Sequence, residues 1–213
     1  MKEGVLYILS LMLFCVGCQI SQPQEKDYNM DKRLEKITLG GGCFWCVSTC
    51  FEMLKGVSSV TSGYAGGMTE YPTYSQVSTG DTGHAEVVQI EYDPEEISLS
   101  ELLDVFWFLH DPTQLNRQGN DIGTQYRSII FYRNEKQKIL AQESMKKSEG
   151  TDLWKGKYVT YIEPLTAFYP AEDYHQNYYK EHLHTPYCSA VVAPKIAKFK
   201  TKFNFKLKSE YKK

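Results

Sequence analysis

Residues 36–46 read KITLGGGCFWC, and this stretch decides how the chain begins to fold. Residues 36–39 are typical of a short strand, and the three glycines that follow supply a flexible turn. Beyond the turn, apolar side chains recur at the spacing of one helix face: Phe44, Val47, Phe51 and Leu54. We therefore expect a strand, a turn rich in free backbone amides, and a helix over residues 43–55 with Cys43 in its first turn.

Cys43 is the first candidate for chemistry. Free N–H groups and the positive end of the helix dipole favour a thiolate there. Cys46 lies one helical turn further on, on the same face and within disulfide reach. A buried pair of small apolar residues is the alternative, and Cys50 is expected in the core. A zinc site of Cys43, Cys46, His84 and His175 is a further alternative, but the sequence has no second paired-ligand motif, so no metal is expected.

Glu86 is the second informative position. Residues 84–92 read HAEVVQIEY, and a period of two puts Glu86 on the face of Val88, Ile90 and Tyr92. A carboxylate at the head of an apolar face is partly desolvated, which raises its pKa and keeps it protonated near neutral pH. Beside a thiolate, such a carboxyl forms an acid–nucleophile pair. A Glu at the exposed end of a strand is the alternative.

Strands and helices alternate along the rest of the chain. Further strands are expected at 57–64, 84–92, 126–132 and 158–163, and further helices at 99–110, 135–147 and 171–182. Long polar loops, 65–83 and 113–125, separate some of these elements, and compact domains keep such loops mostly for function. The pattern predicts an α+β fold, a two-layer α/β sandwich with a ferredoxin-like plait core and long functional loops.

The composition indicates one domain with an ample core. The chain has 213 residues, a net charge of −2 and 42% hydrophobic residues, a balance that gives no electrostatic footprint for nucleic acid. The domain is expected to span residues 34–200. The stretch 195–213 is rich in lysine and is predicted to be a solvated C-terminal tail, of which residues 201–213 lie beyond the domain as a Lys-rich tail.

Residues 1–18 have the shape of a signal peptide. Lys2 precedes an apolar run, 5–16, that is too short to span a bilayer. Gly17-Cys18 resembles the lipobox of bacterial lipoproteins, which makes Cys18 a lipidation candidate, although Cys15 stands where Leu is usual. Residues 19–33 are typical of a flexible tether. We expect an exported protein of the cell envelope, periplasmic or anchored to the membrane as a lipoprotein; a plain secretory signal or a short membrane anchor is the alternative.

Several ordered blocks make the chain similar to peptide methionine sulfoxide reductase, A type. The blocks are GGCFWC (41–46), PTY (72–74), GDTGHAE (80–86), VFW (105–107), HDP (110–112), RQGND (117–121), GTQYRS (123–128), AEDYHQ (171–176) and PYC (186–188). The resemblance covers about 37–200. It implies an enzyme that reduces the S epimer of methionine sulfoxide, peptide-bound or free, and so repairs oxidised proteins.

The resemblance also implies roles for the reacting groups. Cys43 would attack the sulfoxide sulfur and become a sulfenic acid, the reversible rung of cysteine oxidation. Glu86 would supply the proton that the departing oxygen needs. Tyr74 and Tyr126 match tyrosines of the family that donate hydrogen bonds to that oxygen.

Four further positions match the family's substrate pocket. Phe44 and Trp45 would line an apolar pocket for the methyl group of the substrate. Asp121 and Tyr178 match positions that hold the substrate backbone or the water of the pocket.

Recycling needs a second thiol and an external reductant. Many family members have Gly where this chain has Cys46, which is a departure from the family pattern. Cys46 is nevertheless favoured as the resolving cysteine, because it lies one turn away and needs no movement of a loop. Cys188 matches the family's C-terminal cysteine and stays open as resolver or second relay, although a strand-like run (189–192) follows it. A thioredoxin-like partner would reduce the disulfide. No bound cofactor is implied, and a monomer is expected.

Two other classes of protein remain as alternatives. A thioredoxin-type thiol–disulfide oxidoreductase shares the Cys-x-x-Cys motif at a helix start but does not require Glu86. A lipid-anchored binding module with aromatic loops would not require Cys43.

Overall fold

The structure is a computed structural model that describes residues 34–212. The predicted signal peptide (1–18), the lipidation candidate Cys18 and the tether (19–33) lie outside the described residues. The strands are β1 (Glu35–Gly41), β2 (Val57–Ala65), β3 (Ala85–Tyr92), β4 (Arg117–Gln118), β5 (Asp121–Ile122), β6 (Ser128–Tyr132), β7 (Tyr161–Pro164) and β8 (Phe168–Pro170). The helices are α1 (Phe44–Glu52), α2 (Tyr74–Ser78), α3 (Leu99–Leu109), α4 (Glu135–Glu149), α5 (Tyr178–Glu181) and α6 (Ala193–Phe203).

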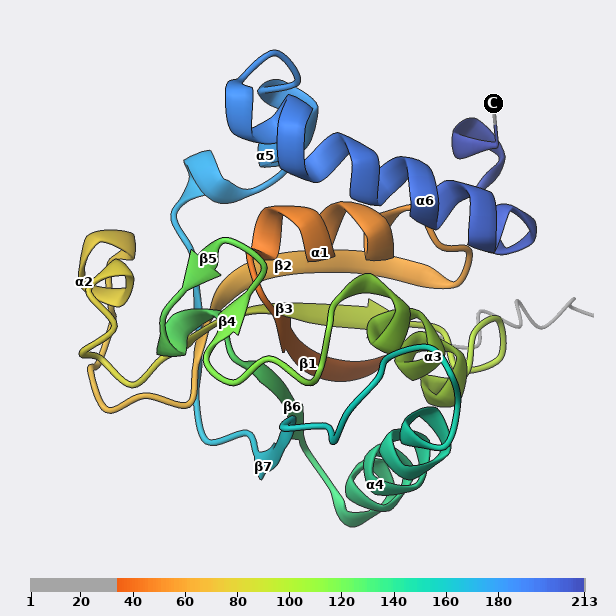
Figure 1. Ribbon diagram of the computed structural model, residues 1–213, viewed down its shortest axis with the longest axis horizontal. Helices are drawn as coiled ribbons and strands as arrows, with labels where there is room; N and C mark the ends of the chain where they lie inside the picture. Colours follow the sequence, from red (N-terminus) through yellow and green to blue (C-terminus); the bar gives the residue numbers. More distant parts are fainter. Residues whose placement is uncertain (1–33, 213) are drawn as a thin grey trace, which may run out of the picture. The chain divides into compact units, whose positions relative to one another are not determined.

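The main sheet confirms the predicted sandwich. Its six strands run in the order β7-β6-β1-β3-β2-β8 (Figure 1). Adjacent strands within the central four, β6-β1-β3-β2, are antiparallel to one another, whereas the edge strand β7 runs parallel to β6. Helix α1 connects β1 to β2, and α3 lies between β3 and β6 in the chain, which is the βαββαβ order of a ferredoxin-like plait; α4 follows β6.

Alternation along β3 separates the two faces of the sheet. Val88 and Ile90 belong to the large core beneath α1 and α3, whereas Ala85 and Val87 belong to a smaller cluster on the other face with Phe131. Glu86 therefore shares the face of α1, as the period of two predicts. This parity brings a carboxyl from the middle of the sheet to the start of α1.

The turn between β1 and α1 depends on Gly42. Its φ angle is +89°, and a Cβ built on it would lie 2.7 Å from the side chain of Gln118. Only glycine fits such a position without strain. The chain therefore leaves β1 sharply, and Cys43 becomes the N-cap of α1, one position earlier than the first helical turn in which the sequence places it.

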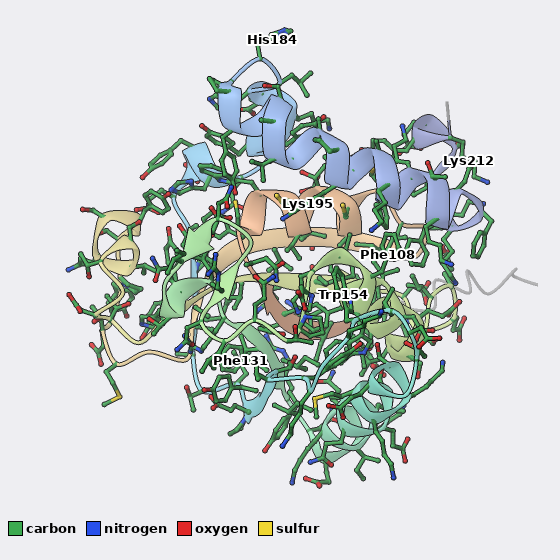
Figure 2. All side chains as sticks on the ribbon, viewed as in Figure 1. Phe108, Phe131, Trp154, His184, Lys195 and Lys212 are labelled. Carbon is green, nitrogen blue, oxygen red and sulfur yellow. The ribbon has the colours of Figure 1, made fainter. Side chains whose placement is uncertain are left out.

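The C-terminal segment differs from both predictions made for it. Residues 189–192, predicted to be strand-like, lie in a π-helical turn, Cys188–Val192, that leads into α6. The predicted solvated tail is also wrong: Phe199 and Leu207 are fully buried, and Leu207 forms a β-bridge with Leu54. Figure 1 shows α6 lying over α1, and Figure 2 shows His184 and Lys212 at opposite ends of this helical layer.

Among residues 34–212, no helix has the length and apolar character that crossing a membrane would need.

Candidate active site

A cavity of about 330 Å³ opens where β1 ends and α1 begins. The cavity is lined by every predicted site residue except Cys46 and Cys188. The lining residues come from distant parts of the chain. The lining residues are Cys43, Phe44, Trp45, Tyr74, Glu86, Asp121, Tyr126, Tyr178 and Tyr187.

Cys43 and Cys46 form a contacting pair of free thiols, of which Cys43 lines the cavity. Each is 6% exposed, and the Cys43 thiol lies within hydrogen-bonding range of the Cys46 thiol and of the Tyr187 hydroxyl. Burial, and then the contact with Cys46, raise the pKa of Cys43 well above its ordinary value; Tyr187 and the backbone of Trp45 oppose this. Cys43 is thus a thiol in this structure, not the thiolate that the helix start predicts. Desolvation outweighs the helix dipole here.

Glu86 is buried beside the start of α1, with 3% of its surface exposed. The N–H of Phe44, the first free amide of the helix, donates a 3.1 Å hydrogen bond to Oε2 of Glu86. Burial, and then the neighbouring Cys43, raise the pKa of Glu86 well above its ordinary value, and the hydrogen bond from Phe44 only partly offsets them. The sequence argument that this carboxyl is protonated agrees with the structure, and its exposed-end alternative does not.

Tyr74 and Tyr126 bring two phenol groups to the same cavity. Tyr74 opens α2, whose N-cap residue Thr73 forms a capping box with Gln76. Tyr126 ends a short 3-10 turn, Thr124–Tyr126. Burial, and then the neighbouring Glu86, raise the pKa of both tyrosines, so both keep their hydroxyl protons and can donate hydrogen bonds.

Tyr187 is a site residue that the sequence argument did not assign. Its hydroxyl donates a 3.0 Å hydrogen bond to Oδ2 of Asp121. The same hydroxyl is within hydrogen-bonding range of the Cys43 thiol, and burial, followed by the neighbouring Cys43, raises the pKa of Tyr187. Its place in the block PYC (186–188), next to Cys188, was the available signal. Tyr187 therefore links the reactive thiol to Asp121.

Trp45 and Phe44 form the apolar wall of the cavity. The Trp45 ring stacks on Tyr178 with centroids 3.7 Å apart and planes 8° from parallel. Its indole N–H donates a 3.2 Å hydrogen bond to Nδ1 of His175. The Tyr187 ring meets the indole edge-on at a centroid distance of 5.7 Å. The wall is thus rigid and mostly apolar, which suits a small uncharged group.

The remaining cysteines lie away from the cavity lining. Cys50 is 1% exposed on α1, and burial raises its pKa, which fits the predicted core role. Cys188 is fully buried at the start of the π-helical turn, where its N–H donates to Oγ1 of Thr185. Both thiols are free, as are Cys43 and Cys46.

In the alternative zinc site, both ring nitrogens of His84 make contacts with the backbone instead of a metal ion. Nδ1 of His84 accepts a hydrogen bond from the N–H of Gly67, and its Nε2 lies 2.8 Å from the carbonyl of Thr69. Between residues 34 and 212, no group of three or more His, Cys, Asp or Glu side chains is arranged to hold a metal ion. His84 therefore ties loop 65–83 together.

An α+β sandwich with a buried thiol, a protonated carboxyl and phenol donors in one cavity defines a cysteine-dependent oxidoreductase. The family profile described as "Peptide methionine sulfoxide reductase" matches residues 35–207. The chain therefore belongs to the peptide methionine sulfoxide reductase family. Its curated relatives place it in the A type, so it is an enzyme of the peptide-methionine (S)-S-oxide reductase class.

Relatives cover nearly the whole described chain. "Peptide methionine sulfoxide reductase MsrA" of Polynucleobacter asymbioticus is 51% identical over 178 residues, 84% of this chain and 94% of the relative. The protein of the same name from Sulfolobus acidocaldarius is 54% identical over 170 residues, 80% of this chain and 96% of the relative.

Solved structures agree with this. Mxr1 from Saccharomyces cerevisiae in reduced form is 35% identical with a TM-score of 0.67, covering 76% of this chain and 92% of that one. "Methionine sulfoxide reductase A of Corynebacterium diphtheriae" is 37% identical with a TM-score of 0.64, covering 72% of this chain and 78% of that one.

Proposed function

We propose that this chain reduces methionine sulfoxide through a sulfenic acid on Cys43 and a Cys43–Cys46 disulfide. The observation that carries the proposal is the shared cavity of Cys43 and Glu86, in which burial raises the pKa of both groups. A thiol and a carboxylic acid at one site can pass protons without involving bulk water. Oxygen transfer from a sulfoxide requires both a nucleophile and an acid.

The first step moves the sulfoxide oxygen to Cys43. The Cys43 sulfur attacks the sulfur of the substrate, while Glu86 gives its proton to the sulfoxide oxygen. The bond between the two sulfur atoms then breaks as the hydroxyl moves from the substrate sulfur to the Cys43 sulfur. Methionine leaves, Cys43 becomes a sulfenic acid, and Glu86 recovers a proton from the Cys43 thiol. The cysteine sulfur is oxidised by two electrons and the methionine sulfur is reduced by two. The thiol proton replaces the one that Glu86 donates, so no net proton is consumed.

The phenol groups assist this transfer. Tyr74 and Tyr126 line the cavity and hold their protons, so they donate hydrogen bonds to the oxygen as negative charge develops on it. Phe44 and Trp45 receive the methyl group, and Asp121 and Tyr178 lie where they can contact the substrate backbone or the water of the pocket.

The second step uses Cys46. Its thiol contacts the Cys43 thiol, and the attack of Cys46 on the sulfenic acid forms the disulfide and releases water. Cys188, fully buried at the start of a helical turn, would need that turn to open first. Two electrons from a thioredoxin-type dithiol would then restore both thiols.

The N-terminal predictions are part of the proposal. We infer export, lipidation at Cys18, a tether (19–33) and a monomeric catalytic domain that acts on oxidised envelope proteins. Metabolic labelling with a fatty acid tests the lipid: the full chain should incorporate it, and a Cys18→Ala variant should not.

The test of the catalytic proposal is a single turnover without reductant. The purified full chain is mixed with a peptide carrying both sulfoxide epimers, and the methionine peptide is quantified for each epimer. We expect consumption of the S epimer alone, and no product from Cys43→Ser. Product from Cys43→Ser, or consumption of the R epimer at an equal rate, would reject the proposed site.

A further inference from the structure

We propose that His175 is a positioning residue that fixes the Trp45 indole in the substrate pocket. This inference rests on the proposed function, because the pocket matters only if a methionine sulfoxide side chain enters it. His175 does not line the cavity, so it acts through Trp45.

The hydrogen bond defines the state of the imidazole. An indole N–H can only donate, so Nδ1 of His175 is the acceptor at 3.2 Å. In a neutral ring the proton is then on Nε2. That nitrogen has no hydrogen-bond partner in the structure and lies 3.9 Å from Oε2 of Glu172. A single tautomer of a buried ring therefore holds the indole.

Stacking alone would leave the indole free to rotate. The parallel contact with Tyr178 at 3.7 Å fixes the plane of the Trp45 ring, but a stacked ring can still turn or slide within its plane. The hydrogen bond to His175 removes that freedom, because it fixes one edge of the ring. The two contacts together determine which edge of the indole faces the substrate's methyl group.

The backbone around His175 is held in place by hydrogen bonds to strand β2. It ends a short 3-10 turn, Asp173–His175, and is 2% exposed. The next residue, Gln176, exchanges two 3.0 Å hydrogen bonds with the backbone of Ser62 on β2. The sheet therefore fixes Gln176, which fixes the adjacent His175, and His175 in turn holds the Trp45 indole.

The same imidazole contacts two other walls of the cavity. Its ring centroid lies 4.3 Å from that of Tyr74 and 5.3 Å from that of Phe44. Glu172 accepts a 2.9 Å hydrogen bond from the backbone N–H of Tyr74 and another from the Tyr64 hydroxyl. A purely structural role in packing these rings is thus the rival explanation, and the test must separate it from the hydrogen bond.

Two substitutions give opposite predictions. His175→Phe keeps a ring and its packing but removes the acceptor. His175→Asn loses the ring but keeps an oxygen near the position of Nδ1. In single turnovers at increasing S-sulfoxide peptide, we expect His175→Phe to raise the apparent Kd about tenfold, the size of one lost hydrogen bond. The maximal rate of methionine release should stay within about threefold, and His175→Asn should bind more tightly than His175→Phe. An Asn variant weaker than the Phe variant would overturn the proposal in favour of packing.

A double-mutant cycle tests whether His175 acts through Trp45. In a Trp45→Phe background, which lacks the indole N–H, His175→Phe should change the apparent Kd by less than about twofold. Effects of the two substitutions that simply add would contradict the proposal.

A measurement that needs no turnover separates a failure of this inference from a failure of the proposed function. The indole N–H resonance of Trp45, assigned with Trp45→Phe, should be slow to exchange in the wild-type chain and in His175→Asn, and fast in His175→Phe. If the wild-type chain releases no methionine, the proposed function fails, and this resonance still reports whether His175 holds the indole. Equal exchange in all three proteins would reject the hold itself.

Discussion

Cys43 and Glu86 both carry protons, because both side chains are buried in one cavity. The helix start would favour a thiolate, but its first amide, the N–H of Phe44, donates to Glu86 instead. The helix terminus thus acts on the acid of the pair. Activation of the thiol then depends on proton transfer within the cavity.

The protonated carboxyl of Glu86 predicts that the rate of methionine release depends on pH. The pKa of Glu86 lies above the ordinary carboxyl range, so its acid form is present at lower pH and is lost as the pH rises through that pKa. We expect methionine release, measured below saturating substrate, to fall on the alkaline side. Glu86→Gln should lower the rate about a hundredfold or more. A flat rate through the alkaline range would contradict the role of Glu86 as acid.

A control separates this reading from disulfide exchange. Reduction of a small-molecule disulfide by Cys43 and Cys46 needs no proton from Glu86, so it should survive in Glu86→Gln. Parallel loss of both activities would mean that the substitution disturbs the thiols themselves.

The residues of the site show what sequence could and could not supply. Glu86 follows from alternation within one strand, and Cys43 from a local turn. Tyr187 and His175 lie more than 100 positions from Trp45 in the chain, and only the packing of the C-terminal segment brings them to it. Local periodicity carries no information on such contacts. The raised pKa of Cys43 has the same origin, because it comes from burial by distant residues.

Helix α6 is the element where composition misled the prediction. Its lysines suggested a solvated tail, but Ile196, Phe199 and Phe203 recur at helix spacing and are buried. The apolar period was present and was outweighed by the charge count. Elements β1, α1, β3 and α3, in contrast, lie within a few residues of their predicted bounds, because period and caps agree there, as with the capping box of Ser98 and Glu101.

The packing of α6 predicts a large effect of one substitution. Phe199 is fully buried, so Phe199→Ala should lower the free energy of unfolding by about 3–5 kcal/mol. Phe205, which is 70% exposed, is the matched control, and Phe205→Ala should change it by less than about 0.5 kcal/mol. Chemical denaturation followed by circular dichroism gives both values. Equal and small changes in the free energy of unfolding would contradict the packing of α6 and favour a solvated tail.

At the scale of the whole molecule, the sheet and α3 are joined by a buried neutral histidine. Nδ1 of His110 donates to the carbonyl of Phe106, and its Nε2 lies 2.7 Å from Oγ of Ser128 on β6. Burial lowers the pKa of His110 to about 4, although the Phe106 carbonyl opposes the shift. Protonation would place a charge between two layers of the fold.

This histidine predicts acid sensitivity. Because its pKa is lower in the folded chain than the ordinary value of about 6.5, its contribution to stability is complete above pH 6.5 and is lost as the pH falls towards 4. Between pH 7 and pH 4, the wild-type chain should lose about 3 kcal/mol more than His110→Gln. His184→Gln, at an exposed position, should behave like wild type. Equal losses in His110→Gln and wild type would contradict this role.

The disulfide left by one turnover tests the proposed roles of Cys43 and Cys46 most directly. The full chain is treated with one equivalent of S-sulfoxide peptide without reductant, quenched by alkylation and mapped by mass spectrometry. We expect a Cys43–Cys46 bridge in the wild-type chain, the same bridge in Cys188→Ser, and a sulfenic acid on Cys43 in Cys46→Ser. A Cys43–Cys188 bridge in the wild-type chain would contradict the proposed recycling route, and oxidation that spares Cys43 would contradict the site.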